Sequence, residues 1–179
     1  MISLSPFTTV VLAFDPGIHG AYALVDDDGL AAVFDLPVLK VGATKTTARA
    51  DLDPATLTMS LNQVRHRVDH CFIERVAARP GQGVTSMFRF GYAAGTIHGV
   101  VAALGIPYTF VTPQTWQRAL RVPSSDDAAR QRAQQLYPGQ AANLANKAHA
   151  HRADALLIAH HGLNTLRQGA GAGDKAVPA

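Results

Sequence analysis

Three carboxylates lie at places in this sequence where a charged side chain is costly. Asp15 ends the apolar run TTVVLAF, Glu74 ends the apolar segment CFI, and Asp154 lies within the helical pattern HRADALLIA. Moving a lone carboxylate out of water costs several kcal/mol unless another group compensates its charge. We therefore expect the three side chains to converge from distant segments and to share a cation.

Two of these residues also have a simpler explanation. Asp15 precedes Pro16 and Gly17, so it could be an ordinary turn residue. Asp154 could lie on the exposed face of its helix. Glu74 is harder to explain in this way, because it closes an apolar strand and is the only glutamate among thirteen acidic residues. The expectation of a shared site therefore depends most on Glu74.

Length and composition predict a single α/β domain. A chain of 179 residues with 47% hydrophobic residues can bury a core without disulfides or structural metals. Its one cysteine, Cys71, excludes an intramolecular disulfide and a CxxC metal motif, so we expect a reducing, cytoplasmic setting. The first apolar run stops at Asp15 and is too short for a signal peptide or a membrane span, so we expect no membrane partner.

The charge balance permits a polyanionic partner without requiring one. The formal net charge is +3, and arginines recur along the whole chain. Such side chains suit phosphate contacts, yet many basic proteins bind no nucleic acid.

The apolar pattern predicts a β-rich first half. Four strands and one helix are expected, at residues 8–14, 20–26, 30–36 and 70–74 for the strands and 54–68 for the helix. The short DDDG turn indicates that the second and third strands pair antiparallel. Between residues 37 and 53 the periodicity is lost, and we expect a mobile basic loop.

The second half is predicted to be mainly helical. One strand and four helices are expected, at residues 107–112 for the strand and 86–105, 113–120, 124–138 and 147–167 for the helices. The first of these helices should be capped by Thr85 or Ser86 and closed by Gly105, and the third should have aspartates in its first turn. We expect a domain of residues 1–167 and a disordered tail of residues 168–179.

Three glycines recur every four residues on one face of the helix expected over residues 86–105. They are Gly91, Gly95 and Gly99. Glycine costs about 1 kcal/mol per helical position relative to alanine, so the three together indicate close backbone packing. This face would contact either the chain's own sheet or a second copy of the chain.

Four segments, taken in order, match the pattern of one known family. They are FDPGIHGAYALVD, FIERVAARPGQGVTSMFRFGYAAGTIHGVVAALGIP, VTPQTW and HRADALLIAHHG, and the resemblance as a whole covers roughly residues 9–162. The chain resembles the RuvC-like Holliday junction resolvases of the RNase H-like superfamily, in particular those of phages and prophages. This resemblance implies an RNase H-like mixed five-stranded sheet with helices on both faces.

The resemblance also implies a metal site built from four positions. The family's metal-binding acids match Asp15, Glu74, His151 and Asp154, with histidine at a position where many members have aspartate. Because His151 and Asp154 are three residues apart, both lie on one helix face. The imidazole would act as a metal ligand or as the base that deprotonates water.

The implied reaction is metal-dependent hydrolysis of a DNA phosphodiester bond. Oxygen ligands suit Mg²⁺ or Mn²⁺, and two such ions about 4 Å apart would activate water and stabilise the leaving oxygen. The chain would then be a crossover junction endodeoxyribonuclease of a bacterial cell that nicks four-way junctions symmetrically and leaves 5′-phosphate and 3′-hydroxyl ends. A two-fold homodimer would match the symmetry of the junction.

Basic and polar side chains near these positions are candidate DNA contacts. Many family members carry an aromatic wedge just after the glutamate, where this chain has Val76 and Ala77, so Phe88 and Phe90 are the alternative wedges. The candidate DNA-binding residues are Arg75, Arg79, Gln82, Arg89, Arg118, Lys147 and Arg152.

Two other features leave the DNA footprint open. Asp126 and Asp127 lie where relatives commonly place lysines, a loss for which arginines elsewhere could compensate. The basic loop would add either a flexible clamp or a solvated surface through Lys40, Lys45 and Arg49.

Three other functions remain compatible with these residues. Another RNase H-like nuclease could use the same metal site on branched, flap or RNA-containing duplexes. A phosphate-binding ATPase or sugar-kinase-like domain also opens with DPG after a first strand, but 179 residues supply only one lobe of that fold. A non-catalytic junction-binding protein is the third, although all four metal-site positions carry competent ligands.

Overall fold

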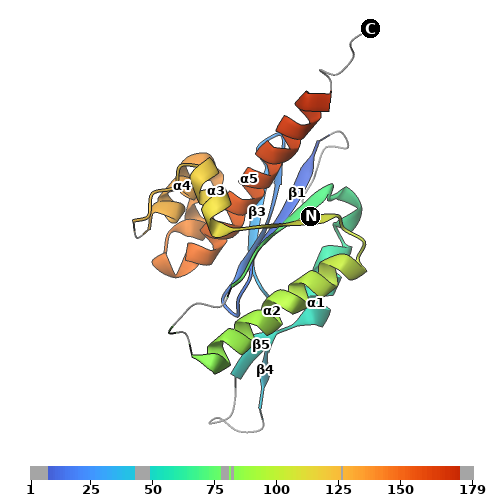
Figure 1. Cartoon of the computed structure of the whole chain (residues 1–179), viewed down its shortest axis with the longest axis vertical. Coiled ribbons are helices and arrows are strands. Elements are labelled where there is room, and N and C mark those ends of the chain that lie inside the picture. The colour runs from blue at the N-terminus through green and yellow to red at the C-terminus, as the bar shows by residue number, and fades with distance from the viewer. Residues whose placement is uncertain (1–7, 43–48, 78–80, 82, 126, 174–179) are drawn as a thin grey trace.

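A five-stranded mixed sheet forms the centre of the structure, a computed structural model that describes residues 8–42, 49–77, 81, 83–125 and 127–173. The strand order is β3-β2-β1-β6-β7 (Figure 1). The strands are β1 (Val10–Asp15), β2 (Ala21–Asp26), β3 (Ala31–Asp35), β6 (His70–Glu74) and β7 (Tyr108–Val111). The first three pair antiparallel, whereas β6 and β7 run parallel to β1. The expected mixed sheet of five strands is therefore confirmed.

Helices cover both faces of this sheet, as expected (Figure 1). One face carries α1 (Pro54–Asn62) and α2 (Val84–Ala103). The other carries α3 (Pro113–Ala119), α4 (Ala128–Leu136) and α5 (Ala150–Gly173). Short 3₁₀ helices lie at Arg65–Arg67, Pro138–Leu144 and Lys147–His149.

Each face of the sheet has its own hydrophobic core because the side chains of a strand alternate between faces. In β1, Val11 and Ala13 belong to the core that includes α5, whereas Leu12 and Phe14 belong to the core that includes α1 and α2. All six β1 residues are buried, which explains why this strand is a continuous apolar run. The centre of the sheet is therefore desolvated on both sides.

The segment expected to be a mobile loop instead contains two strands. β4 (Val38–Val41) and β5 (Arg49–Leu52) pair antiparallel as a separate two-stranded sheet. Each strand has only four residues, too few to show a clear periodicity in the sequence. A contact from α2 holds the hairpin, because Arg89 donates a hydrogen bond to the carbonyl oxygen of Ala50 at 2.6 Å. The expectation of a loop was wrong for these strands, whereas Lys45 lies outside the described residues.

Only the C-terminal boundary of α2 agrees with that of the expected helix. Gly105 follows the helix with φ of 69°, the left-handed conformation expected of a closing glycine. At the start, α2 begins at Val84 after Gly83, and no side chain caps it. The expected cap at Thr85 or Ser86 is therefore wrong, because both residues lie inside the first turn.

The last two helices also differ from their expected ranges. Asp127 precedes α4 in a left-handed conformation, and its carboxylate pairs with Arg130 instead of capping the helix. α5 continues to Gly173, past the expected domain end at residue 167, while residues 174–179 lie outside the described residues. Within the described ranges, the helices are all too short or too polar to cross a bilayer.

Gly162 allows α5 to approach the sheet closely. A β-carbon built at this position would lie 2.4 Å from Cδ2 and 2.7 Å from Cε2 of Phe72, whose ring is buried in β6. Real β-carbons do not approach other atoms so closely, so only glycine fits here. Asp154 lies about two turns earlier on the same helix, so the close approach also sets the position of its carboxylate.

We predict that Gly162→Ala lowers the free energy of unfolding by about 1–3 kcal/mol, because overpacking against Phe72 outweighs the gain in helix propensity of about 1 kcal/mol. The matched control is Gly169→Ala, at an exposed position of α5 where an added β-carbon meets nothing within 4 Å. The control should stabilise the protein by up to about 1 kcal/mol. Urea denaturation measures both effects, and equal stabilisation by the two variants would contradict the prediction.

Candidate active site

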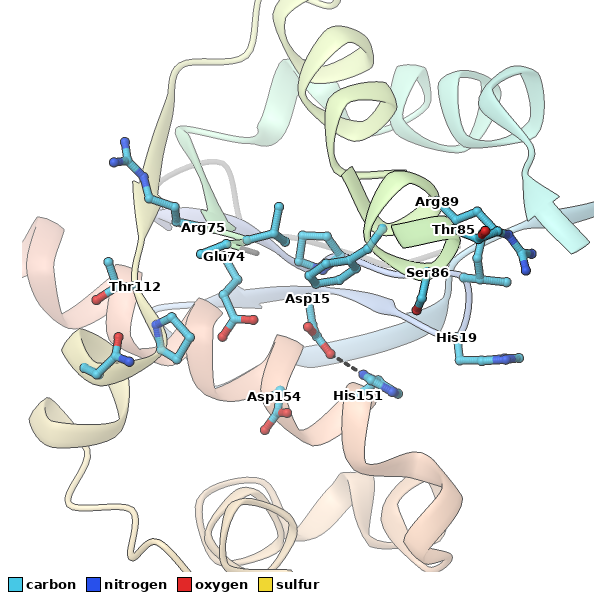
Figure 2. Close-up of a pocket in the computed structure, with 17 residues that line it drawn as sticks. Asp15, His19, Glu74, Arg75, Thr85, Ser86, Arg89, Thr112, His151 and Asp154 are labelled. Carbon is cyan, nitrogen blue, oxygen red and sulfur yellow. Dashed lines mark hydrogen bonds and ion pairs between the residues drawn. The ribbon is translucent and has the colours of Figure 1, made fainter. Parts of the chain in front are cut away.

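An open pocket of about 990 Å³ lies where β1, β6 and α5 come together. Its lining includes Asp15 from β1, Glu74 from β6, and both His151 and Asp154 from α5 (Figure 2). β1 and β6 are adjacent and parallel, so their carboxyl ends meet at one edge of the sheet. The structure therefore brings together all four residues that the sequence indicated.

The turn after β1 depends on close backbone contact. A β-carbon at Gly20 would lie 2.2 Å from the carbonyl oxygen of Asp15, so only glycine fits at this position. Gly17 has φ of 152°, a conformation that other residues rarely adopt. The chain thus reverses tightly and pairs Asp15 with Ala21 of β2. Asp15 is consequently both the residue that opens the turn and a residue of the pocket, where it is only 5% exposed.

His151 is hydrogen-bonded to Asp15. The ring atom Nδ1 lies 2.5 Å from Oδ2 of Asp15 (Figure 2), and the imidazole is 46% exposed. The hydrogen bond to Asp15 raises the pKa of His151 above its ordinary value, although burial opposes this effect. When His151 is protonated, it donates its Nδ1–H to Asp15 and offsets part of the negative charge of the pocket.

Asp154 titrates near neutral pH. Burial, followed by the charges of Asp15 and Glu74, raises the pKa of Asp154 to about 7, while the charge of His151 acts in the opposite direction. Asp15 and Glu74 are therefore close enough to disfavour the ionisation of Asp154. Perturbed acids of this kind are typical of functional sites.

Glu74 accepts a hydrogen bond from a residue that sequence reasoning did not place in the site. Trp116 of α3 donates its Nε1–H to Oε1 of Glu74 at 2.9 Å, and the indole is 1% exposed. The segment VTPQTW was noticed because it contributes to the family resemblance. Nothing in the linear sequence indicated that α3 would fold back over the end of β6.

The oxygen and nitrogen atoms of the pocket that could bind a metal suit a hard divalent cation, although they do not form a closed set of ligands. Across the described part of the chain, no three His, Cys, Asp or Glu side chains are arranged to hold a metal ion. Two of the acids instead have hydrogen-bond partners, since Asp15 bonds His151 and Glu74 bonds Trp116. A divalent cation would offset the charges of Asp15 and Glu74, which after burial are the next causes of the raised pKa of Asp154, so the chemistry of the pocket fits Mg²⁺ or Mn²⁺.

Two of the candidate DNA-binding arginines line the pocket. Arg75 lines the pocket, and its guanidinium lies 5.7 Å from the centre of the Phe110 ring, which is outside the lining. Arg89 also lines the pocket, but it donates to the carbonyl oxygen of Ala50 and lies 3.9 Å from Asp51. Arg89 therefore ties α2 to the β4–β5 hairpin, in addition to any contact with DNA.

The other candidates among the described residues lie outside the lining of this pocket. Arg152 makes two hydrogen bonds to the carboxylate of Asp35, at 2.6 and 2.5 Å, and these tie α5 to β3. Its guanidinium is thus already occupied by a carboxylate. Arg118 and Lys147 are exposed, on α3 and just before α5 respectively, whereas Arg79 and Gln82 lie outside the described residues.

The first turns of α2 form one wall of the pocket. Thr85 and Ser86, expected to cap the helix, instead line the pocket (Figure 2). Phe90 also lines it, whereas Phe88 is 75% exposed and lies outside the lining. Sequence reasoning missed the two hydroxyl residues because a position near a helix start is explained equally well by a capping role.

Comparison with known proteins finds structural relatives and no sequence relatives. No protein-family model and no curated protein matches the chain. A structure of Thermus thermophilus RuvC matches with a TM-score of 0.52 and 19% identity, covering 90% of this chain and 97% of that one. T. thermophilus RuvC in complex with a Holliday junction substrate matches with a TM-score of 0.56 and 17% identity, covering 90% and 96%.

These matches confirm the expected fold. The chain has the RNase H-like fold of RuvC, and the likeness extends over nearly the whole length of both chains. At identities below 20% the likeness establishes the fold alone. The activity is therefore argued from the site.

We predict that Asp154→Asn stabilises the protein in EDTA at alkaline pH. Asp154 has a pKa of about 7 in the folded protein and an ordinary value of 3.8 in the unfolded chain, so the folded state loses stability as the pH rises from about 4 to about 7, and the loss is complete above that. Asparagine carries no charge and avoids this loss. The free energy of unfolding of the variant should therefore exceed that of the wild type by up to about 4 kcal/mol at pH 8, and by less towards pH 5. Thermal denaturation across this pH range measures the difference.

Asp28→Asn is the matched control, because Asp28 is exposed and distant from the pocket. This variant should change stability by a small amount that does not vary between pH 5 and pH 8. Addition of Mg²⁺ should stabilise the wild type more than Asp154→Asn. A stability difference for Asp154→Asn that is the same at both ends of the pH range would contradict the prediction.

Proposed function

We propose that this protein is a metal-dependent, structure-selective DNA endonuclease that resolves four-way (Holliday) junctions by paired symmetric nicking. The observation that carries the proposal is the meeting of Asp15, Glu74, His151 and Asp154 in one pocket. The fold adds support, since one similar structure is RuvC in complex with a Holliday junction substrate. The products would carry 5′-phosphate and 3′-hydroxyl ends.

The four pocket residues would hold Mg²⁺ or Mn²⁺, two ions per site, which supply a nucleophilic water and relief of charge on the phosphate. For this role Asp154, whose pKa is raised to about 7, would have to be ionised. Asp15 would have to give up its hydrogen bond with His151 Nδ1 to serve as a ligand. The imidazole is nearly half exposed, so it can then exchange protons with water in the pocket.

Phosphate recognition would fall mainly to Arg75, Arg118 and Lys147. Arg75 lines the pocket, and its guanidinium rests on the ring of Phe110. A planar guanidinium can bind two phosphate oxygens at once, which orients the strand relative to the carboxylates. Arg152 contributes less directly, because Asp35 already occupies its guanidinium.

The glycine stripe of α2 supports a homodimer. Among the residues that the structure describes, a β-carbon at Gly91, Gly95 or Gly99 would meet no side chain and no backbone of another element within 4 Å, so these glycines do not pack against the chain's own sheet. The buried residues of α2 are instead Ala93 and Ile97, together with Val101. The stripe thus presents bare helix backbone on the outside of the molecule, where a second helix can approach closely.

Exposed aromatic side chains border this stripe. Phe88 and Tyr92 of α2 are 75% and 53% exposed, and the edge strand β7 exposes Tyr108 and Phe110 nearby. His98 of α2 links the two elements, since it contacts both β7 rings. A patch of this kind is typical of an interaction surface. A two-fold dimer through it would provide two active sites for the two strands that resolution must cut.

We predict that the wild type nicks a mobile four-way junction symmetrically with Mg²⁺ or Mn²⁺ and that EDTA abolishes the reaction. Asp15→Asn should bind the junction as the wild type does but fail to cut it, because asparagine cannot replace the carboxylate charge. Denaturing gels of end-labelled strands measure nicking, and gel-shift titration measures binding.

The substrate panel separates this function from its alternatives. It contains the junction, a flap, an RNA–DNA hybrid and a linear duplex of the same sequence. Faster cutting of the flap or the hybrid would favour another RNase H-like nuclease. Tight junction binding without nicking in either metal would favour a non-catalytic junction-binding protein.

We predict that Gly95→Arg converts a homodimer into a monomer, because a long charged side chain cannot fit between two closely packed helices. Gly169→Arg, at an exposed helical position away from the stripe, is the matched control and should remain dimeric. Size-exclusion chromatography with light scattering measures the mass of each. A wild type that is monomeric at all concentrations, or a Gly95→Arg variant that stays dimeric, would contradict the proposed surface.

A further inference from the structure

The indole of Trp116 makes the most deeply buried polar contact of the candidate active site. Its ring is 1% exposed, and its Nε1–H donates to Oε1 of Glu74 at 2.9 Å. We propose that Trp116 is a positioning residue that orients the Glu74 carboxylate for cation binding and, as the only tryptophan of the chain, reports on that binding. The inference rests on the proposed metal-dependent function.

The chain places Trp116 against Glu74 through a short sequence of local contacts. Glu74 at the end of β6 pairs with Val111 of β7. Thr112 follows directly and caps α3, because its hydroxyl oxygen accepts a hydrogen bond from the backbone N–H of Thr115. Pro113 at the first position of α3 lacks an N–H and suits a helix start. The helix therefore turns back over the strand end within one turn and directs the indole at the carboxylate.

The chemistry of indole suits this task. Its N–H is a donor and never an acceptor, so Trp116 can fix one carboxylate oxygen without competing for a cation. A glutamate side chain has several rotatable bonds, and restraining it in advance removes an entropic cost from cation binding. The large apolar ring belongs to the core between the sheet and α5, which prevents it from moving with the carboxylate.

His151 and Trp116, which are hydrogen-bonded to Asp15 and Glu74 respectively, therefore differ in their freedom to move. His151, which bonds Asp15, is 46% exposed on its side-chain surface and can leave the carboxylate for solvent. Trp116 has no such freedom, because its ring is enclosed by the core. We therefore expect the Glu74 contact to persist when the pocket is occupied, whereas the Asp15 contact is exchanged.

Two substitutions at Trp116 test the proposal. Trp116→Phe removes the N–H donor and replaces the indole with a smaller ring. Replacement of Trp116 by 3-benzothienylalanine removes only the donor, since sulfur takes the place of N–H in a ring of nearly the same size. The matched control is Tyr137→Phe, which removes another aromatic donor of the same core, the hydroxyl that contacts His160 Nδ1 at 2.8 Å.

Cation binding is measured without DNA, from the electron paramagnetic resonance signal of free Mn²⁺. Both Trp116 variants should bind Mn²⁺ about tenfold or more weakly than the wild type, since partners that orient metal ligands typically contribute 10- to 100-fold. Tyr137→Phe should bind Mn²⁺ as the wild type does, even where its thermal stability falls. In the wild type, Mg²⁺ should change the tryptophan fluorescence, and Glu74→Gln should remove that response.

The outcomes distinguish this inference from the proposed function. Unchanged Mn²⁺ affinity in the benzothienylalanine variant would overturn the positioning role, and nicking by the wild type would leave the proposed function intact. Should Trp116→Phe fail to fold, the benzothienylalanine variant decides, because it preserves the packing. A wild type that neither binds Mn²⁺ nor nicks the junction would overturn both.

Discussion

Repulsion among carboxylates at the buried end of the sheet is the constraint on which the rest of this structure depends. Asp15 and Glu74 end two adjacent parallel strands, and Asp154 faces them from α5. Burial and the charges of Asp15 and Glu74 disfavour the ionisation of Asp154 and raise its pKa to about 7. Two further contacts act on the other acids, because His151 Nδ1 is hydrogen-bonded to Asp15 and the indole N–H of Trp116 donates to Glu74.

α5 links the stability of the fold to the geometry of the pocket. Ala153 and Leu157 pack in the core of the sheet, while His151 and Asp154 of the same helix face the carboxylates. Gly162 sets how closely the helix approaches β6, because no larger residue fits against Phe72 there. The distance between α5 and the sheet therefore determines both how well the core packs and where the Asp154 carboxylate lies. A site built on rigid elements in this way is held more precisely than one built on loops.

The two faces of α2 have different surroundings. Its inner face buries Ile97 and Val101 in the core shared with α1, and its first turns contribute Thr85 and Ser86 to the pocket. Its outer face carries the glycine stripe, which contacts nothing in the described part of the same chain. A second copy docked along this face would lie on the same helix that borders the pocket. Assembly and substrate binding would then be coupled through one rigid element.

The sequence by itself determined the sheet and the acidic positions, because burial on both faces produces continuous apolar runs and a charge that ends such a run is conspicuous. Asp15 and Glu74 were recognisable for that reason, and the helical spacing put His151 and Asp154 on one helix face, while the family resemblance indicated that this face meets the two strand ends. Only the tertiary structure decided which distant groups the side chains meet. Trp116 reaches Glu74, and Arg152 binds a carboxylate instead of remaining available to phosphate, because strand order and helix docking bring these segments together. Local periodicity encodes which face of an element is buried, but it carries no information about the partner across the fold.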